Sequence, residues 1–115
     1  MNKIDMHRDI CNELNNTYTK KNHDYGDSFS ETFNKLGIIS AVTRITDKYN
    51  RLVSLCMLPD EERKVKDESI SDTLLDMANY CIMTEIELRK RDIKNSNPSD
   101  AESYYDDSWI EELCD

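Results

Sequence analysis

The chain has 115 residues, 24 of them acidic and 15 basic, and the resulting net charge of −9 disfavours long nucleic acids, whose phosphates need clustered Lys and Arg. The length fits one domain, and the presence of only two glycines and two prolines speaks against an all-β chain with many tight turns. No apolar run approaches the roughly 18 residues of a membrane span, and the N-terminus lacks the apolar stretch of a signal peptide, so we expect a cytoplasmic protein that does not bind membranes.

The first predicted helix covers residues 3–21, where apolar side chains recur every three or four residues. A polar break at residues 22–27 follows, and Gly26 within it is a natural place for a positive φ. The motif S-x-x-E that begins at Ser28 matches a capping box. It predicts a short helix that ends at Gly37.

The second long helix is predicted from Ile38 to about Met57, where apolar residues alternate spacings of four and three. Such a seven-residue rhythm suits packing against near-parallel neighbours in a bundle. Its members are Ile38, Val42, Ile45, Tyr49, Leu52 and Cys56. We expect a solvated loop at residues 60–66 and a last long helix over about 68–91.

These elements predict an all-α fold, a small bundle of three long helices and one short helix. The apolar faces are wide, which predicts a homo-oligomer. The four cysteines form no C-x-x-C pair, so we expect them to be small buried hydrophobes rather than zinc ligands.

The predicted domain organisation is a helical domain at residues 1–94 and an acidic tail at residues 95–115. The first segment carries 17 acids and 15 bases, a net charge of −2, and the tail carries seven acids and no base, a net charge of −7. Most of the net charge of the whole chain therefore comes from the tail. Two interpretations of the tail stay open: a solubilising end, or a segment that folds on a partner protein.

Two polar stripes accompany the apolar faces. The cationic stripe lies on one side of the second long helix, with an aspartate beside it: Arg44, Asp47, Lys48 and Arg51. The acidic stripe repeats every four residues on the last helix and is followed by an amide and an aromatic: Glu68, Asp72, Asp76, Asn79 and Tyr80. Such stripes can be solvated helix surfaces, but three like charges at this spacing repel one another unless bases or a divalent cation neutralise them.

The functional interpretation is a phosphate site between these helices. Arg offers forked donors that match phosphate oxygens, and Lys adds a point charge. The polar cluster between the first two helices, His23, Asp24 and Tyr25, is a further candidate because it lies at a helix junction. A tyrosine from this region could stack on a base.

At these residues the chain resembles a known family. The motifs are Tyr25-Gly26, then R-I-x-D-K-x-x-R-L from Arg44, then D-E-S-I-x-D-T-L-x-D-x-A-N-Y from Asp67. They resemble the phage and bacterial family called nucleotide modification associated domain 1, a domain of unknown function, over about residues 20–85. The resemblance implies a link to nucleotides, and a host-cell cytoplasmic location if the chain is phage-encoded.

A more distant similarity is to the MazG-like, all-α nucleoside triphosphate pyrophosphohydrolases. Those helical bundles bind Mg²⁺ through E-x-x-E on one helix and E-x-x-D on another. Here the acidic stripe would correspond to the second motif with a spacing of four, and the cationic stripe stands where the first motif would be. If this similarity extends to catalysis, the Mg²⁺ ligands would be Glu68, Asp72, Asp76 and Asp47.

Three functions follow as hypotheses. The first is a nucleotide-binding protein that captures its ligand and sequesters, for example, a signalling nucleotide of bacterial defence. Its ligand-binding residues would be Arg44, Lys48, Arg51, His23, Asp24, Tyr25, Asn79 and Tyr80. The second is a Mg²⁺-dependent nucleotide hydrolase, and the third is a protein-interaction module that uses the acidic tail.

Overall fold

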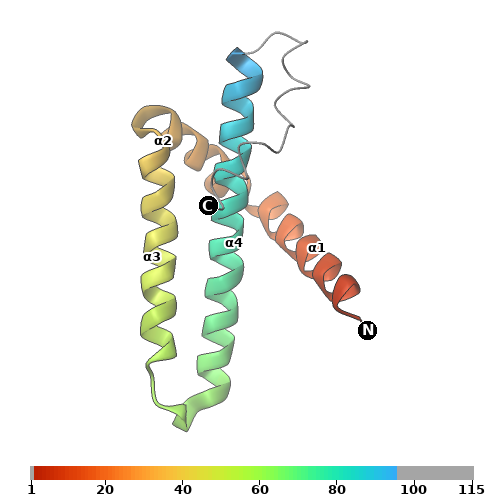
Figure 1. Ribbon diagram of the computed structural model, residues 1–115, viewed down its shortest axis with the longest axis vertical. Helices are drawn as coiled ribbons and strands as arrows, with labels where there is room; N and C mark the ends of the chain where they lie inside the picture. The colour runs from red at the N-terminus through yellow and green to blue at the C-terminus, as the bar shows by residue number, and fades with distance from the viewer. Residues whose placement is uncertain (1, 96–115) are drawn as a thin grey trace, which may run out of the picture. The chain divides into compact units, whose positions relative to one another are not determined.

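The computed structural model describes residues 2–95, and the regular structure in this range is entirely helical (Figure 1). Of residues 23, 24, 62, 94 and 95 it describes only the backbone. The α-helices are α1 (Lys3–Lys21), α2 (Ser28–Leu36), α3 (Ile38–Cys56) and α4 (Arg63–Asn95). The prediction of a small all-α bundle is confirmed. In the described range no helix is long and apolar enough to cross a membrane.

The chain divides into two units, Met1–Thr84 and Glu85–Asp115. The first contains α1, α2, α3 and the larger part of α4. The described part of the second continues α4, where Arg89 Nε lies 3.0 Å from Glu85 Oε1 one turn earlier. The predicted acidic tail lies outside the described residues, apart from the backbone of Asn95.

Helix α1 has the predicted bounds and begins with a side-chain cap. The Oδ1 atom of Asn2 accepts a hydrogen bond of 2.9 Å from the backbone N–H of Asp5, which satisfies one of the unpaired donors of the first turn. Only Leu14 of this helix is buried, and Ile4 is 72% exposed. Within the part of the chain that the structure describes, the apolar stripe of α1 is therefore covered mainly in its C-terminal half.

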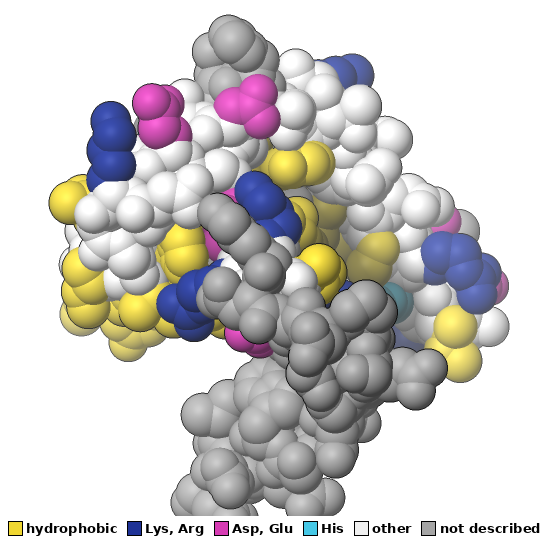
Figure 2. Space-filling model, turned by 90° about the horizontal axis from the view of Figure 1, so that it is seen from above, with side chains coloured by type: hydrophobic (Ala, Val, Ile, Leu, Met, Phe, Trp, Pro, Cys, Tyr) yellow, Lys and Arg dark blue, Asp and Glu magenta, His cyan; other side chains and the backbone are white. Residues whose placement is uncertain are grey.

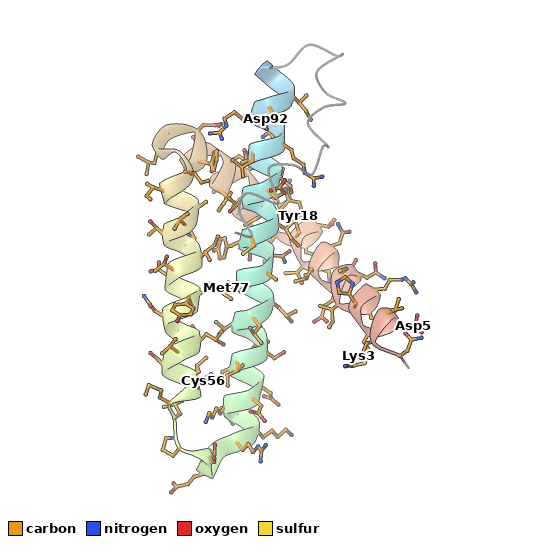
Figure 3. The ribbon with its side chains drawn as sticks, viewed as in Figure 1. Lys3, Asp5, Tyr18, Cys56, Met77 and Asp92 are labelled. Carbon is orange, nitrogen blue, oxygen red and sulfur yellow. The ribbon has the colours of Figure 1, made fainter. Side chains whose placement is uncertain are left out.

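The junction between α1 and α2 corrects two predictions. Residues His23–Asp27 form one π-helical turn, and Gly26 does not have a positive φ. Its lack of a side chain serves close packing instead, because a Cβ atom there would lie 2.5 Å from Asn22 Oδ1 and 2.7 Å from the hydroxyl of Tyr18. Tyr18 stands on the C-terminal half of α1 (Figure 3).

The capping box predicted at Ser28 does not form. A capping residue needs non-helical backbone angles, whereas Asp27 and Ser28 are both helical and no side chain caps α2. The π turn continues into α2 without a break in helical backbone angles. At the other end Gly37 closes α2 as predicted, with φ 79° and its N–H donating to Phe33 O at 2.8 Å.

Helices α3 and α4 run antiparallel side by side (Figure 1). Ala41 of α3 is fully buried, and Ile45, Leu52 and Leu55 are half-buried. The covered face of α3 is thus centred to one side of the predicted stripe, and the stripe members Val42 and Tyr49 stay exposed.

The connection between α3 and α4 is shorter than predicted. Asp60–Glu62 form a 3-10 turn and α4 begins at Arg63, so the expectation of a loop over residues 60–66 is wrong, although residues 60, 61 and 63–65 are exposed as expected. Lys66 explains the early start, because its Nζ donates to Leu58 O at 2.7 Å and to Asp60 Oδ1 at 3.1 Å. These bonds tie the first turn of α4 back to the end of α3.

The core of the first unit is small and partly aromatic. Phe29 and Phe33 of α2 are buried, their ring centroids are 6.5 Å apart, and Tyr80 of α4 lies 6.0 Å from Phe29. The expectation of buried cysteines is wrong for three of the four: Cys11, Cys56 and Cys81 are exposed thiols. Cys114 lies outside the described residues.

Candidate functional site

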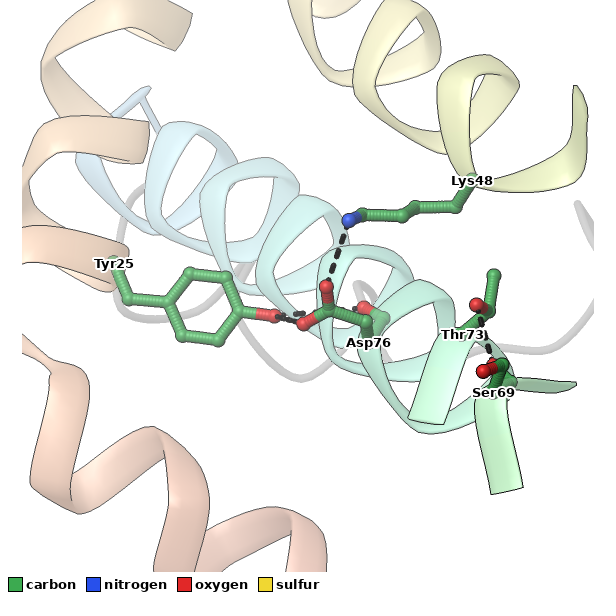
Figure 4. A network of polar contacts seen from close by, with 5 residues as sticks. All are labelled: Tyr25, Lys48, Ser69, Thr73 and Asp76. Atoms are coloured by element: carbon green, nitrogen blue, oxygen red, sulfur yellow. Dashed lines mark hydrogen bonds and ion pairs between the residues drawn. The ribbon is translucent and has the colours of Figure 1, made fainter. Parts of the chain in front are cut away.

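Asp76 of α4 joins three segments of the chain (Figure 4). Its Oδ2 atom lies 2.8 Å from Nζ of Lys48 on α3. Its Oδ1 atom accepts a hydrogen bond of 2.7 Å from the hydroxyl of Tyr25 in the π turn. The acidic stripe, the cationic stripe and the junction cluster, all predicted as site elements, thus meet at one carboxylate.

These contacts shift the pKa values of both acids. Burial alone would raise the pKa of Asp76, but hydrogen bonds from Lys48 and Tyr25, and the charges of Lys48 and Lys21, outweigh burial and hold it below its usual value. Burial, the hydrogen bond to Asp76 and the charge of Asp76 raise the pKa of Tyr25 well above its usual value. Near neutral pH the pair is therefore a carboxylate and a neutral phenol, and the phenol donates.

Tyr80 lies on α4 one turn after Asp76 and completes an aromatic wall. The rings of Tyr25 and Tyr80 meet edge to face, with centroids 5.2 Å apart, an arrangement that the ring quadrupoles favour. Lys48 Nζ lies 6.0 Å from the centroid of Tyr80, and Lys21 Nζ lies 5.9 Å from that of Tyr25. Both predicted aromatics lie in the cluster around Asp76, but in this arrangement each ring packs against the other and a lysine.

Two pockets open on either side of this cluster. The α3-side pocket, of about 290 Å³, is lined by Lys48, Arg51, Ser69, Asp72, Thr73 and Asp76. It contains two of the three predicted cations. Arg51 is exposed and makes no ion pair within the described part of the chain, so its forked donors are available to a ligand.

The α1-side pocket has a volume of about 360 Å³ and is lined by Glu13, Leu14, Thr17, Lys21, Asp72, Leu75, Asp76 and Asn79. Asp72 and Asp76 belong to both pockets. The Nδ2 atom of the buried Asn79 donates to Leu14 O at 3.2 Å, which ties α4 to α1.

The residues of α1 in this second pocket were not predicted from the sequence. Glu13, Thr17 and Lys21 follow one another at intervals of four residues, so they share one face of α1. This polar stripe is the sequence feature that could have identified them as pocket residues. The sequence alone does not show that this face of α1 lies against Asp72 and Asn79, as the structure does.

Not every predicted residue joins the cluster. Arg44, Asp47 and Glu68 are exposed and line neither of the two pockets. The side chains of His23 and Asp24 lie outside what the structure describes. Among described residues, no three or more His, Cys, Asp and Glu side chains come close enough to hold a metal ion. The four predicted Mg²⁺ ligands are therefore not gathered by this fold, although Asp72 and Asp76 line the same pocket.

Comparison with known proteins identifies a family. Residues 21–88 match the family described as nucleotide modification associated domain 1. The matched range includes Tyr25, Lys48 and Asp76, whereas Glu13 and Thr17 precede it. No curated protein and no solved structure matches the chain.

Proposed function

The chain belongs to the nucleotide modification associated domain 1 family, and from this premise we propose that it binds a nucleotide or a nucleotide-derived small molecule. The phosphate occupies the α3-side pocket, where Lys48 and Arg51 hold it. The protein captures its ligand and does not turn it over, as a protein that sequesters a signalling nucleotide would.

The observation that carries the proposal is the position of Arg51. It lines a pocket beside Lys48 and makes no ion pair within the described residues. Lys48 already neutralises Asp76, so Arg51 supplies the positive charge that a phosphate needs. Its planar fork matches two phosphate oxygens at once.

The α1-side pocket supports a ligand larger than phosphate. Its polar side chains Glu13, Thr17 and Asn79 include acceptors and donors for a ribose or a base edge, and Lys21 adds a donor. Each pocket alone is at the small end of the roughly 300–1,000 Å³ range of ligand sites. A ligand that crosses Asp72 and Asp76 would use both.

Titration calorimetry of the full chain with nucleoside mono-, di- and triphosphates tests this function. For the nucleotide that binds, Arg51→Gln should weaken affinity about tenfold to a hundredfold, because a hydrogen bond to a charged group contributes about 1.5–3 kcal/mol. Arg44→Gln is the matched control, since it removes the same charge from the same helix outside both pockets. Equal losses in the two variants, or no binding of any phosphate, would contradict the proposal.

A magnesium-dependent nucleotide hydrolase is the second candidate. Asp72 and Asp76 lie one helical turn apart and line the same pocket, and Mg²⁺ is commonly held by one or two carboxylates together with substrate phosphates. Incubation with nucleotide and Mg²⁺, heat release and chromatography separate the candidates. Intact ligand supports capture, whereas products that disappear in Asp72→Asn support hydrolysis.

We also propose that copies of the chain associate. Large apolar side chains stay exposed on α1, α3 and α4, among them Ile4, Tyr49 and Leu74. Exposed apolar surface of this extent is typical of interaction sites. Light scattering over a range of protein concentrations measures the association, and a monomeric mass throughout would exclude it.

A further inference from the structure

The connection between α3 and α4 forms a third pocket, the hairpin pocket, which the proposed function does not use. Its volume is about 270 Å³, and four apolar residues line most of it: Leu55, Leu58, Pro59 and Val65. Leu58 and Val65 are 50% and 60% exposed. The pocket is therefore open to a ligand from outside.

Exposed apolar side chains alone do not distinguish this region, because hydrophobic side chains also gather over α2 and α3 in the view of Figure 2. The hairpin pocket differs because it is hollow and because Ser69 lines both it and the α3-side pocket. Figure 4 shows Ser69, Thr73 and Asp76 in succession along α4. A ligand held by Arg51 therefore reaches the hairpin pocket by passing Ser69.

Three polar side chains also line the hairpin pocket, those of Glu61, Lys66 and Ser69. The Nζ atom of Lys66 donates to Leu58 O and to Asp60 Oδ1, and since an ammonium group has three N–H donors, one is left for a ligand. The carboxylate of Glu61 accepts hydrogen bonds and repels a phosphate. The pocket thus suits an uncharged group that has apolar faces and an edge with donors and acceptors.

We infer that the hairpin pocket binds the nucleobase of the nucleotide whose phosphate Arg51 holds. This inference rests on the proposed function and names the place of the base. Apolar side chains can cover the flat faces of a base, while a few polar groups bond to its edge. Glu61 and Lys66 supply those polar groups, and the α1-side pocket then receives a group on the other side of the phosphate.

The spacing of the two pockets fits one nucleotide. On α4, Thr73 of the α3-side pocket and Lys66 of the hairpin pocket are seven residues apart, which is roughly 10 Å along the helix. On α3, Arg51 and Leu55 are one turn apart, roughly 6 Å. In a nucleotide a single ribose separates the base from the phosphate, so a base in the hairpin pocket keeps its phosphate within reach of Arg51.

The family match favours the hairpin pocket over the α1-side pocket as the place of the base. Residues 21–88 include every residue that lines the hairpin pocket, whereas Glu13, Leu14 and Thr17 of the α1-side pocket precede the match. A base site that members of this family share must lie within the matched range. Of these two pockets, only the hairpin pocket lies there completely.

Titration calorimetry of the full chain with ribose 5-phosphate and with the monophosphates of adenosine, guanosine, cytidine and uridine tests the inference. These ligands share the ribose and the phosphate and differ in the base. The nucleotide that binds best should bind about tenfold to a hundredfold more tightly than ribose 5-phosphate, because the base adds its own contacts.

The variant Val65→Asn makes the apolar wall of the hairpin pocket polar without changing the charge. It should reduce the advantage of the nucleotide over ribose 5-phosphate at least about threefold and leave the affinity for ribose 5-phosphate unchanged. Val53→Asn is the matched control, since Val53 is 41% exposed on α3 and lines none of the three pockets. It should change neither affinity.

Nuclear Overhauser effects from the base protons to the methyl groups of Leu58 and Val65 are expected in the unmodified protein, so this measurement does not depend on a variant that folds. Effects to Leu14 and Leu75 would instead place the base in the α1-side pocket and overturn the inference. Equal affinities for the nucleotides and ribose 5-phosphate would also overturn it and leave the phosphate site at Arg51 standing. If none of these phosphates binds, both the inference and the proposed function are wrong.

Discussion

At the scale of single residues, the carboxylate of Asp76 links α4 to the π turn and to α3. Its partners Lys48 and Tyr25 were predicted from the sequence as site residues, each by a different pattern. Their meeting was not predicted, because Tyr25 and Asp76 are 51 residues apart in the chain. Periodicity shows which residues share a helix face, but only packing decides which faces touch.

Replacing Asp76 by Asn should destabilise the protein by about 1–2 kcal/mol, because it removes a charge-assisted hydrogen bond and an ion pair whose side chains are 28% and 36% exposed. The lowered pKa of Asp76 also makes its contribution to folding stability depend on pH. Its contribution is present above the pKa of the unfolded chain, about 4, and is lost as the pH falls through the folded pKa. Urea unfolding of both proteins from pH 7 to pH 2.5 should show curves that converge at low pH. A constant difference would contradict this account.

Replacing Tyr25 by Phe should instead change how the stability of the protein depends on pH at alkaline pH. The folded state raises the pKa of Tyr25, so its contribution is complete below the unfolded value, about 10, and is lost as the pH rises above it. The unmodified protein should therefore lose stability more steeply than Tyr25→Phe between about pH 9 and pH 11. If thermal unfolding shows that both proteins lose stability equally with rising pH, Tyr25 does not hold its proton more tightly in the folded state.

Gly26 offers a third residue-scale prediction. We expect Gly26→Ala to destabilise the protein by about 1–2 kcal/mol through overpacking, because the new Cβ would meet Asn22 Oδ1 at 2.5 Å and the Tyr18 hydroxyl at 2.7 Å. The variant Asn22→Ala removes the nearer atom. In a double-mutant cycle it should recover part of the loss, and additive effects would instead indicate a backbone cause.

At the scale of elements, the sequence predicted helix ends well where one residue decides them. Gly37 ends α2 because its φ of 79° suits glycine. The start of α4 was misplaced because Lys66 bonds back to Leu58 O, a contact that no local pattern reveals. The face of α3 was misplaced because its apolar side chains outnumber what α4 covers, so periodicity alone could not choose which of them would be buried.

Helix α1 should depend on a single anchor. Leu14→Ala is expected to cost about 2–3 kcal/mol, since Leu14 is 8% exposed and the substitution leaves a cavity. Ile10→Ala, on the same helix at 46% exposure, is the control and should cost under about 1 kcal/mol. Hydrogen exchange should show lost protection in α1 only for the Leu14 variant. Equal effects would mean that α1 packs along its whole length.

At the scale of the whole molecule, the net charge acts on any anionic ligand. The total is −9, but seven acids and no base lie in residues 96–115, so removal of those residues leaves −2. Most of the net negative charge that repels an anionic ligand therefore comes from residues 96–115. At about 0.01 M salt the Debye length is roughly 30 Å, long enough for that charge to oppose binding.

A protein that ends at Asn95 should bind inorganic pyrophosphate about threefold to tenfold more tightly than the full chain at roughly 0.01 M salt. The two affinities should converge at about 0.5 M salt, where screening removes the repulsion. A full-length variant in which the seven acids become Asn or Gln is the matched control. It should behave like the truncated protein if charge alone is responsible. An effect that persists at high salt, or that truncation alone produces, would show that residues 96–115 act through contact, the property expected of an interaction segment.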